Sequence, residues 1–142
     1  MREKHGVTAV IFDEKGGKRF FLSLHRVLNW KGWEFVKGGI DGDEQPEQAV
    51  LREIDEESGL AKISIVARLP KKVSWTSKGV KYNYTPFVLR GDMAEPVDLV
   101  QEVIEHDGFK WVEEPKVESF LFHEDNKRIF REVLGILGQK TK

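Results

Sequence analysis

Residues 38–60 read GGIDGDEQPEQAVLREIDEESGL. Pro46 suits the first turn of a helix, because the N–H group that proline lacks has no helical partner there. Gly59 suits the residue just beyond the last turn, where the backbone needs a left-handed conformation. The residues between them are good or neutral helix formers. The stretch therefore predicts a glycine-rich loop that leads into one helix.

Three glutamates lie on one face of this predicted helix. At about 100° per residue, Glu53, Glu56 and Glu57 share an arc of about 100°. The neighbouring arc is apolar and is expected to face a core: Val50, Leu51 and Ile54. Carboxylates at these spacings repel one another, but their oxygens suit a hard divalent cation such as Mg²⁺.

A solvated acidic face is the ordinary interpretation of such a cluster when it stands alone. Here a further acid, Glu44, precedes the helix, and a glycine-rich loop leads into it. Backbone N–H groups at the start of a helix suit a phosphate group. The combination favours a site for a metal and a phosphate.

Nine positions of the stretch fit one spaced pattern, G-x5-E-x7-R-E-U-x-E-E-x-G-U, where U is a bulky aliphatic residue. They are Gly38, Glu44, Arg52, Glu53, Ile54, Glu56, Glu57, Gly59 and Leu60. In this pattern the chain resembles the Nudix hydrolases. The resemblance implies an α/β fold in which a mixed sheet is sandwiched between helices. It also implies a single domain over residues 1–142, with the signature loop and helix as the catalytic platform.

The resemblance implies a role for each signature residue. The metal ligands would be the glutamates of the helix, with help from the Gly38 carbonyl: Glu53, Glu56 and Glu57. One of these, or Glu44, would be the general base. Arg52 would orient a signature glutamate through a charge-assisted hydrogen bond. Mg²⁺ is the implied cofactor, with Mn²⁺ as the alternative ion.

The loop before the helix departs from the family pattern. Family members often carry E-x-G-E there, whereas this chain has Asp41-Gly42-Asp43-Glu44, with the glycine displaced by one position. Gln45 stands at the expected N-cap in place of a Ser, Thr or Asp. Neither departure removes a signature carboxylate.

The substrate must be argued from outside the signature. Residues 33–41 (WEFVKGGID) resemble the dinucleoside polyphosphate and RNA 5′-pyrophosphohydrolase branches of the family. Residues 105–111 (EHDGFKW) resemble a later segment of the diadenosine tetraphosphate hydrolases. There the glutamate that corresponds to Glu105 assists metal or base chemistry.

Further residues are candidates for contact with the substrate. Lys37 and Gly39 flank the start of the signature and are placed to meet phosphate oxygens. Tyr82 and Tyr84 are two residues apart on a predicted strand, so they share a face and either stack on a base or belong to the core. Lys81 lies beside them in the sequence.

These features together predict a metal-dependent hydrolase of a phosphoanhydride bond in a nucleoside diphosphate linked to another group. A dinucleoside polyphosphate such as diadenosine tetraphosphate is the first candidate substrate. Nucleoside triphosphates, nucleotide sugars and RNA 5′ ends remain alternatives. Two other classes also stay open, namely a catalytically silent nucleotide-binding module and a calcium-binding or structural acidic helix.

Composition narrows the class of protein. The chain has 142 residues, of which 39% are hydrophobic and 33% charged, which fits one soluble globular domain. A net charge of −1 gives no strong signal for nucleic acid or a membrane surface. The absence of cysteine excludes disulfides, thiolate catalysis and cysteine-ligated zinc. No signal-peptide core or membrane-length apolar run is present, so a cytoplasmic location is expected, and the oligomeric state stays open.

The rest of the chain alternates between strand and helix patterns. Strands are predicted at residues 6–12 and 20–25, forming a hairpin, and at 62–69, 73–76, 80–89 and 109–112. Residues 99–106 are ambiguous between strand and loop. A short helix is predicted before Phe120, and an amphipathic C-terminal helix over about 125–137 that ends at Gly138, followed by a frayed tail. Trp30 and Trp33 are interpreted as core side chains.

Overall fold

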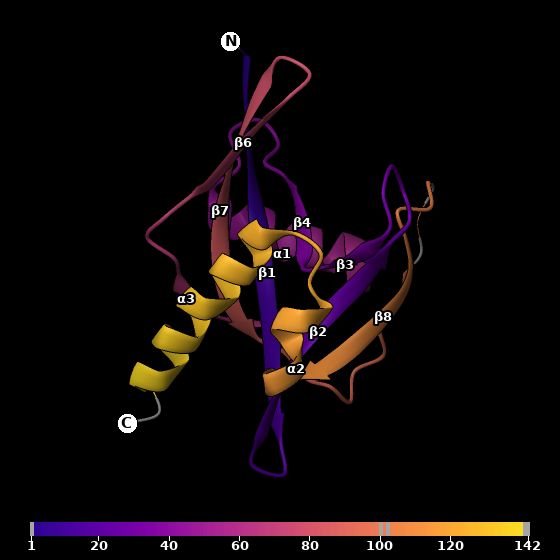
Figure 1. The fold of residues 1–142 in the computed structure, drawn as a ribbon, viewed down its shortest axis with the longest axis vertical. Coiled ribbons are helices and arrows are strands. Elements are labelled where there is room, and N and C mark those ends of the chain that lie inside the picture. Colours follow the sequence, from indigo (N-terminus) through magenta and orange to yellow (C-terminus); the bar gives the residue numbers. More distant parts are fainter. Residues whose placement is uncertain (1, 100, 102, 141–142) are drawn as a thin grey trace.

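A computed structural model describes residues 2–99, 101 and 103–140 of the chain. The strands are β1 (Arg2–Lys15), β2 (Lys18–Arg26), β3 (Gly32–Glu34), β4 (Val36–Gly39), β5 (Ser64–Arg68), β6 (Val73–Ser77), β7 (Val80–Arg90) and β8 (His106–Glu113). The helices are α1 (Pro46–Ser58), α2 (Glu114–Phe120) and α3 (Glu124–Lys140). In Figure 1, α2 and α3 lie in front of the strands and α1 lies behind them.

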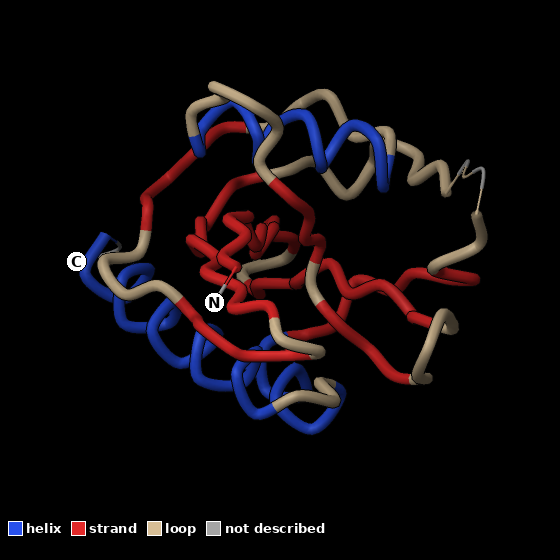
Figure 2. Tube along the Cα trace, turned by 90° about the horizontal axis from the view of Figure 1, so that it is seen from above, coloured by secondary structure: helices blue, strands red, loops and turns tan. Residues whose placement is uncertain are grey.

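The sheet separates two apolar cores. Successive residues of a strand point to opposite faces, and β1 uses both faces. Val10 and Phe12 pack with residues of α2 and α3, whereas Ala9 and Ile11 pack with residues of α1. This double burial explains why residues 6–12 read as a continuous apolar run instead of an alternating one. Figure 2 shows helices on both sides of the strands, so the predicted sandwich of a sheet between helices is confirmed.

The sheet is mixed and branches beside the signature loop. Among the described residues, strand β1 pairs in parallel with β7 along most of its length, whereas the other pairs are antiparallel. On its other edge, β1 pairs first with β4 (Gly6 opposite Gly39) and then with β2 (Phe12 opposite Phe21). The change of partner along one edge sends β4 toward α1, and this places the signature loop against the helix.

The ends of α1 follow the sequence prediction. Gly59 has φ +73° and its N–H donates to the Asp55 carbonyl at 2.9 Å. At the other end, the backbone N–H of the N-cap residue Gln45 donates to the Gln48 side chain at 2.9 Å, which is the reciprocal half of a capping box. Val50 and Ile54 are buried, but Leu51 is 43% exposed. The prediction that Leu51 faces the core was wrong, because it lies at the edge of the apolar arc.

Several boundaries differ from the predicted ones. The β1–β2 hairpin is confirmed, but both strands extend into polar sequence that apolar patterning does not mark. The ambiguous segment 99–106 contains no strand in its described part before His106, where β8 begins; Val100 and Glu102 lie outside the described residues. Helix α3 continues to Lys140, so the predicted end at Gly138 was wrong. Residues 141–142 of the predicted tail lie outside the described part.

No described helix combines the length and the apolar character that crossing a membrane requires.

Candidate active site

The glycine loop and helix α1 meet at Gly38. A Cβ atom on Gly38 would lie 2.0 Å from the Cδ atom of Glu53, which is far inside van der Waals contact. The carboxyl group of Glu53 therefore rests on the glycine backbone. The Lys37 N–H in turn donates to the Glu57 carboxyl at 3.4 Å. Strand β4 thus holds two of the three signature glutamates at their carboxyl ends.

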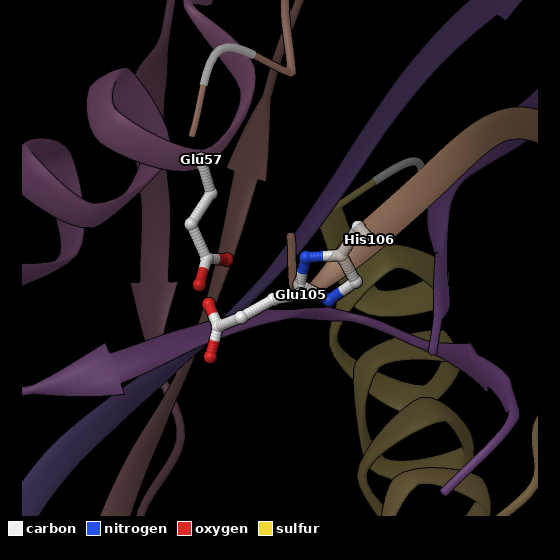
Figure 3. A group of neighbouring side chains, drawn as sticks. All are labelled: Glu57, Glu105 and His106. Atoms are coloured by element: carbon white, nitrogen blue, oxygen red, sulfur yellow. The ribbon is translucent and has the colours of Figure 1, made fainter. Parts of the chain in front are cut away.

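A third carboxylate joins them from a distant part of the chain. Glu53, Glu57 and Glu105 line one pocket of about 550 Å³ and a second hollow of about 780 Å³ beside it. Glu56 lines only the second hollow and is 57% exposed. In Figure 3 the carboxyl groups of Glu57 and Glu105 point toward one another, one from α1 and one from the segment before β8. Ligand atoms of Glu57, Glu105 and His106 lie within 4.8 Å of one another.

Protein groups balance the charges of this pocket only in part, since Arg52 pairs with Glu53 at 2.8 Å and Arg26 lies 3.8 Å from Glu105. Burial raises the pKa of Glu57 to about 9, and the nearby carboxylates of Glu53, Glu105 and Glu34 add to the effect. Burial also raises the pKa of Glu53. A proton therefore remains on this cluster at neutral pH unless another positive charge arrives. Most of the donors here are carboxylate oxygens, with one ring nitrogen from His106, so the residues fit a hard divalent cation such as Mg²⁺.

Arg52 organises the outer side of the signature. Its Nε and Nη2 atoms donate to the two oxygens of Glu44 at 2.8 and 2.9 Å, and Nη1 donates to Glu53 at 2.8 Å and to Glu56 at 3.1 Å. Nη2 also donates to the Gly39 carbonyl at 2.8 Å. These acceptors raise the pKa of Arg52, the Glu44 hydrogen bonds contributing most. The guanidinium therefore ties the loop to two glutamates of the helix.

Both carboxylate oxygens of Glu44 accept hydrogen bonds from Arg52. The hydrogen bonds from Arg52, and then the one from the Asp41 N–H, lower the pKa of Glu44 to about 2. Glu44 is absent from the lining of both pockets described above. A carboxylate with so low a pKa is a weak proton acceptor. The two hydrogen bonds from Arg52 indicate that Glu44 holds the guanidinium in position.

The Arg52→Lys variant is expected to lower kcat by about 10- to 100-fold, because lysine does not reproduce the planar fork that spans Glu44 and Glu53. The measurement is steady-state kinetics together with a metal titration, in which the affinity for the cation should fall as well. Arg131→Lys is the matched control. Arg131 is an exposed arginine of α3 that pairs with Glu118 of α2, and neither residue lines the pocket. A normal kcat with unchanged metal affinity would show that Arg52 has another role.

Aromatic rings form the far wall of the 550 Å³ pocket. Trp75 stacks on Tyr82 with ring centroids 5.2 Å apart and planes inclined by 11°, and the Tyr84 centroid lies 4.8 Å from Trp75. The Lys37 ammonium lies 5.7 Å from the Trp75 centroid, and all four residues line the pocket. We call Trp75, Tyr82 and Tyr84 the aromatic wall.

The residues predicted to contact the substrate line the pocket, with the exception of Lys81. Gly38, Gly39 and Lys37 line it together with the glutamates described above. Lys81 does not appear among its lining residues. The Lys81 ammonium lies 4.0 Å from Glu3, because Lys81 alternates with the tyrosines along β7 and projects from the other face.

Sequence reasoning missed some of the lining residues. Trp75 was predicted on a strand but was given no role, and Trp30, interpreted as a core residue, lines the pocket with Arg26 above its ring. The position of Trp75 was open to prediction, because the turn after Ser77 sets Trp75 opposite Tyr82. Arg26 follows the strand predicted over residues 20–25, a position from which it could reach a ligand, and it lines the pocket while it pairs with the buried Glu34.

Comparisons with known proteins agree with this geometry. A family model described as NUDIX domain matches residues 2–133. The chain is 42% identical over 97 residues to an RNA pyrophosphohydrolase of Vibrio atlanticus, covering 56% of this chain and 55% of that protein. It is 46% identical over 80 residues to an RNA pyrophosphohydrolase of Acidiphilium cryptum, covering 49% of each. The chain therefore spans about half the length of the curated relatives it matches.

Solved structures share the fold at lower identity. The structure of a C. elegans Ap4A hydrolase binary complex matches with a TM-score of 0.83 and 21% identity, covering 96% of this chain and 98% of that one. The NUDIX domain of Shewanella oneidensis NrtR, complexed with ADP ribose, matches with a TM-score of 0.70 and 18% identity, covering 94% and 90%. At these identities the likeness concerns the arrangement of the chain.

Proposed function

Because the chain belongs to the Nudix hydrolase family, we propose that it hydrolyses a phosphoanhydride bond in a nucleoside diphosphate linked to a further group. The observation that carries the proposal is the meeting of Glu53, Glu57 and Glu105 in one pocket with the glycine loop. A silent binding module would have little use for three clustered carboxylates, of which Glu57 has a pKa raised by burial and, after that, by its acidic neighbours.

A division of labour among the side chains follows from their positions. A divalent cation, when bound, would neutralise phosphate oxygens and make water a better nucleophile. Glu53, Glu57 and Glu105 would hold it, with Mg²⁺ as the first choice and Mn²⁺ as the alternative. Lys37 and Arg26 line the same pocket and would receive the remaining phosphate charge. We assign the general base to a carboxylate of the pocket and not to Glu44, since both Glu44 oxygens already accept hydrogen bonds from Arg52.

A dinucleoside polyphosphate is the substrate that we propose. The aromatic wall offers flat apolar surface for a base, next to the cations and carboxylates that a polyphosphate with bound metal requires. A smaller pocket of about 220 Å³ shares Lys37 and Trp75 with the main one and is lined further by His123, Asp125 and Asn126. These side chains offer hydrogen-bonding partners for a second ring system. The layout thus provides two places for bases around one place for phosphates.

RNA 5′ ends are the second candidate substrate. The observation in their favour is the sequence identity with curated RNA pyrophosphohydrolases over about half of the chain. The same pocket would accept the 5′ nucleotide, and the two candidates differ in the group attached at the far end of the phosphate chain. Kinetics distinguishes them.

The test is a comparison of kcat/KM in Mg²⁺ for diadenosine tetraphosphate, ADP-ribose, a nucleoside triphosphate and a 5′-triphosphorylated RNA. The products are resolved by chromatography. We expect diadenosine tetraphosphate to give the highest value. A preference of about tenfold or more for another substrate, a difference worth ~1.4 kcal/mol, would overturn the substrate assignment while leaving the hydrolase assignment intact. Binding without Mg²⁺-dependent turnover of any of them would favour a silent module.

The Tyr82→Ala variant is expected to raise KM for diadenosine tetraphosphate by about 5- to 100-fold with a smaller change in kcat, because base stacking is lost while the carboxylates stay in place. The measurement is steady-state kinetics over a range of substrate concentrations. Phe109→Ala is the matched control, since Phe109 is an aromatic side chain that is 43% exposed and lies outside the lining of the described pockets. A change in kcat alone would contradict a stacking role.

A further inference from the structure

A buried carboxylate contacts two cations that line the pocket. Glu34 on β3 has no solvent-exposed side-chain surface. Its Oε2 atom accepts a hydrogen bond from His106 Nε2 at 2.7 Å and one from Arg26 Nη1 at 3.2 Å. Its Oε1 atom has no hydrogen-bond partner among the described residues, although the Lys37 ammonium lies 3.4 Å away. Glu34 thus faces three basic side chains from three different strands.

Glu34 is ionised in this setting. Burial opposes the charge, but the His106 hydrogen bond and the positive charges of Lys37 and Arg26 more than offset it and lower the pKa of Glu34. A carboxylate accepts hydrogen bonds only, so His106 carries its hydrogen on Nε2. Lys37 and Arg26 therefore share a fixed counter-charge in Glu34.

The two cations connect this buried charge to the pocket. The Arg26 and Lys37 side chains are 13% and 30% exposed, and both line the pocket with the signature glutamates. Arg26 Nη1 also lies 3.8 Å from Glu105. Arg26 is therefore shared between Glu34 at 3.2 Å and Glu105 at 3.8 Å. Glu34 competes with the carboxylates of the pocket for the positive charges of Arg26 and Lys37.

We propose that Glu34 is a positioning residue, which fixes Lys37 and Arg26 where they line the pocket and limits their pairing with Glu57 and Glu105. The proposal deepens the proposed function and rests on it for the identity of the phosphate ligand. Glu34 acts through the two cations and does not touch the substrate.

The structure separates this role from a purely structural one. Removing one partner of a buried ion pair usually destabilises the fold, but glutamine keeps the shape of Glu34 and an oxygen that accepts the hydrogen bond from His106. Arg26 and Lys37 also keep some exposure to solvent, so Glu34→Gln should lower the melting temperature without preventing folding. Its effect should appear in phosphate binding.

The experiment measures binding of imidodiphosphate, a pyrophosphate analogue with a P–N–P bridge that resists hydrolysis, by calorimetry in excess Mg²⁺. We expect Glu34→Gln to weaken binding about tenfold. In a Lys37→Met background the same change should have an effect at least about threefold smaller, because one of its two routes of action is gone. Glu114→Gln is the matched control; it removes a carboxylate that pairs with Arg19 at 2.6 Å outside the pocket.

Each outcome bears on the proposal. Unchanged binding by Glu34→Gln, or equal losses in the wild-type and Lys37→Met backgrounds, overturns it. If Glu34→Gln does not fold, Lys37→Met and Arg26→Met decide, since binding as tight as in the wild type for both would remove the cations from the argument. The hydrolysis panel remains a separate readout. Analogue binding that depends on Glu34 without turnover of any substrate would overturn the proposed function alone.

Discussion

Glu57→Gln is expected to lower kcat in Mg²⁺ by about 10³-fold, because one of three facing carboxylates loses its charge. Metal affinity should fall as well. The measurement is steady-state kinetics with a Mg²⁺ titration, and Asp55→Asn, an exposed acid on the same helix, is the matched control. Wild-type turnover in excess EDTA would contradict the metal-dependent mechanism.

The same variant should make the metal-free protein more stable, with a defined pH dependence. Folded Glu57 keeps its proton up to about pH 9, whereas its ordinary pKa is 4.5. The folded state therefore binds more protons than the unfolded chain between these values, and its free energy of unfolding falls as the pH rises through this window. Glutamine removes that loss, so the gain from Glu57→Gln should be small near pH 5 and largest near pH 9.

Thermal unfolding in EDTA at pH 6 and pH 8.5 measures this difference. The melting temperature of Glu57→Gln should exceed that of the wild type more at pH 8.5 than at pH 6. Added Mg²⁺ should raise the melting temperature of the wild type strongly at pH 8.5 and that of the variant little, because bound ligand stabilises only the state that holds it. If the wild type and Glu57→Gln had equal melting temperatures at both pH values, the raised pKa of Glu57 would be contradicted.

Gly38→Ala is the second change with a large expected effect. The new Cβ would lie 2.0 Å from Glu53 Cδ, so either the loop or the glutamate must move. We expect kcat to fall by about 10²-fold, since an error of about 1 Å in the position of a catalytic group has effects of that size. Overpacking of this kind should also cost about 1 to 3 kcal/mol in the free energy of unfolding.

Kinetics and denaturant unfolding of Gly38→Ala test both parts. Gly108→Ala is the matched control, a strand glycine whose Cβ would meet no atom within 4 Å. A fully active Gly38→Ala protein would mean that the contact between Gly38 and Glu53 is not needed for metal binding. The contrast between the two glycines isolates the effect of close approach from that of lost backbone freedom.

Local signals in the sequence predicted the platform of the site well. Pro46, Gly59 and the glutamate spacing gave α1 nearly to the residue, because caps and helical periodicity are short-range properties. The same kind of signal misled at Gly138, where a glycine is carried inside α3 instead of ending it. A glycine after an apolar helix permits an end but does not impose one.

Local signals could not predict which distant segments of the chain contact one another. The approach of Glu105 to Glu57 was anticipated only through a family resemblance, since no local pattern links α1 to the segment before β8. The contacts of Glu34 depend on how β2, β3 and β8 pair, and strand pairing over such distances is set by the whole fold. Leu51 shows a limit of local patterns as well. Helical periodicity defines the apolar arc of α1, but it does not say which edge of that arc a neighbouring element covers.

The parallel pairing of β1 with β7 has a consequence for the order of folding. It joins the start of the chain to a strand in its second half, with Thr8 opposite Pro86, and the entropy of closing so long a loop makes such contacts late and slow. The hairpin of β6 and β7 and the helix α1 each form from neighbouring residues, but they come together only across this pair. Refolding should therefore restore helical structure early and ligand binding last, and a nascent chain should acquire its site only after the second half has been synthesised.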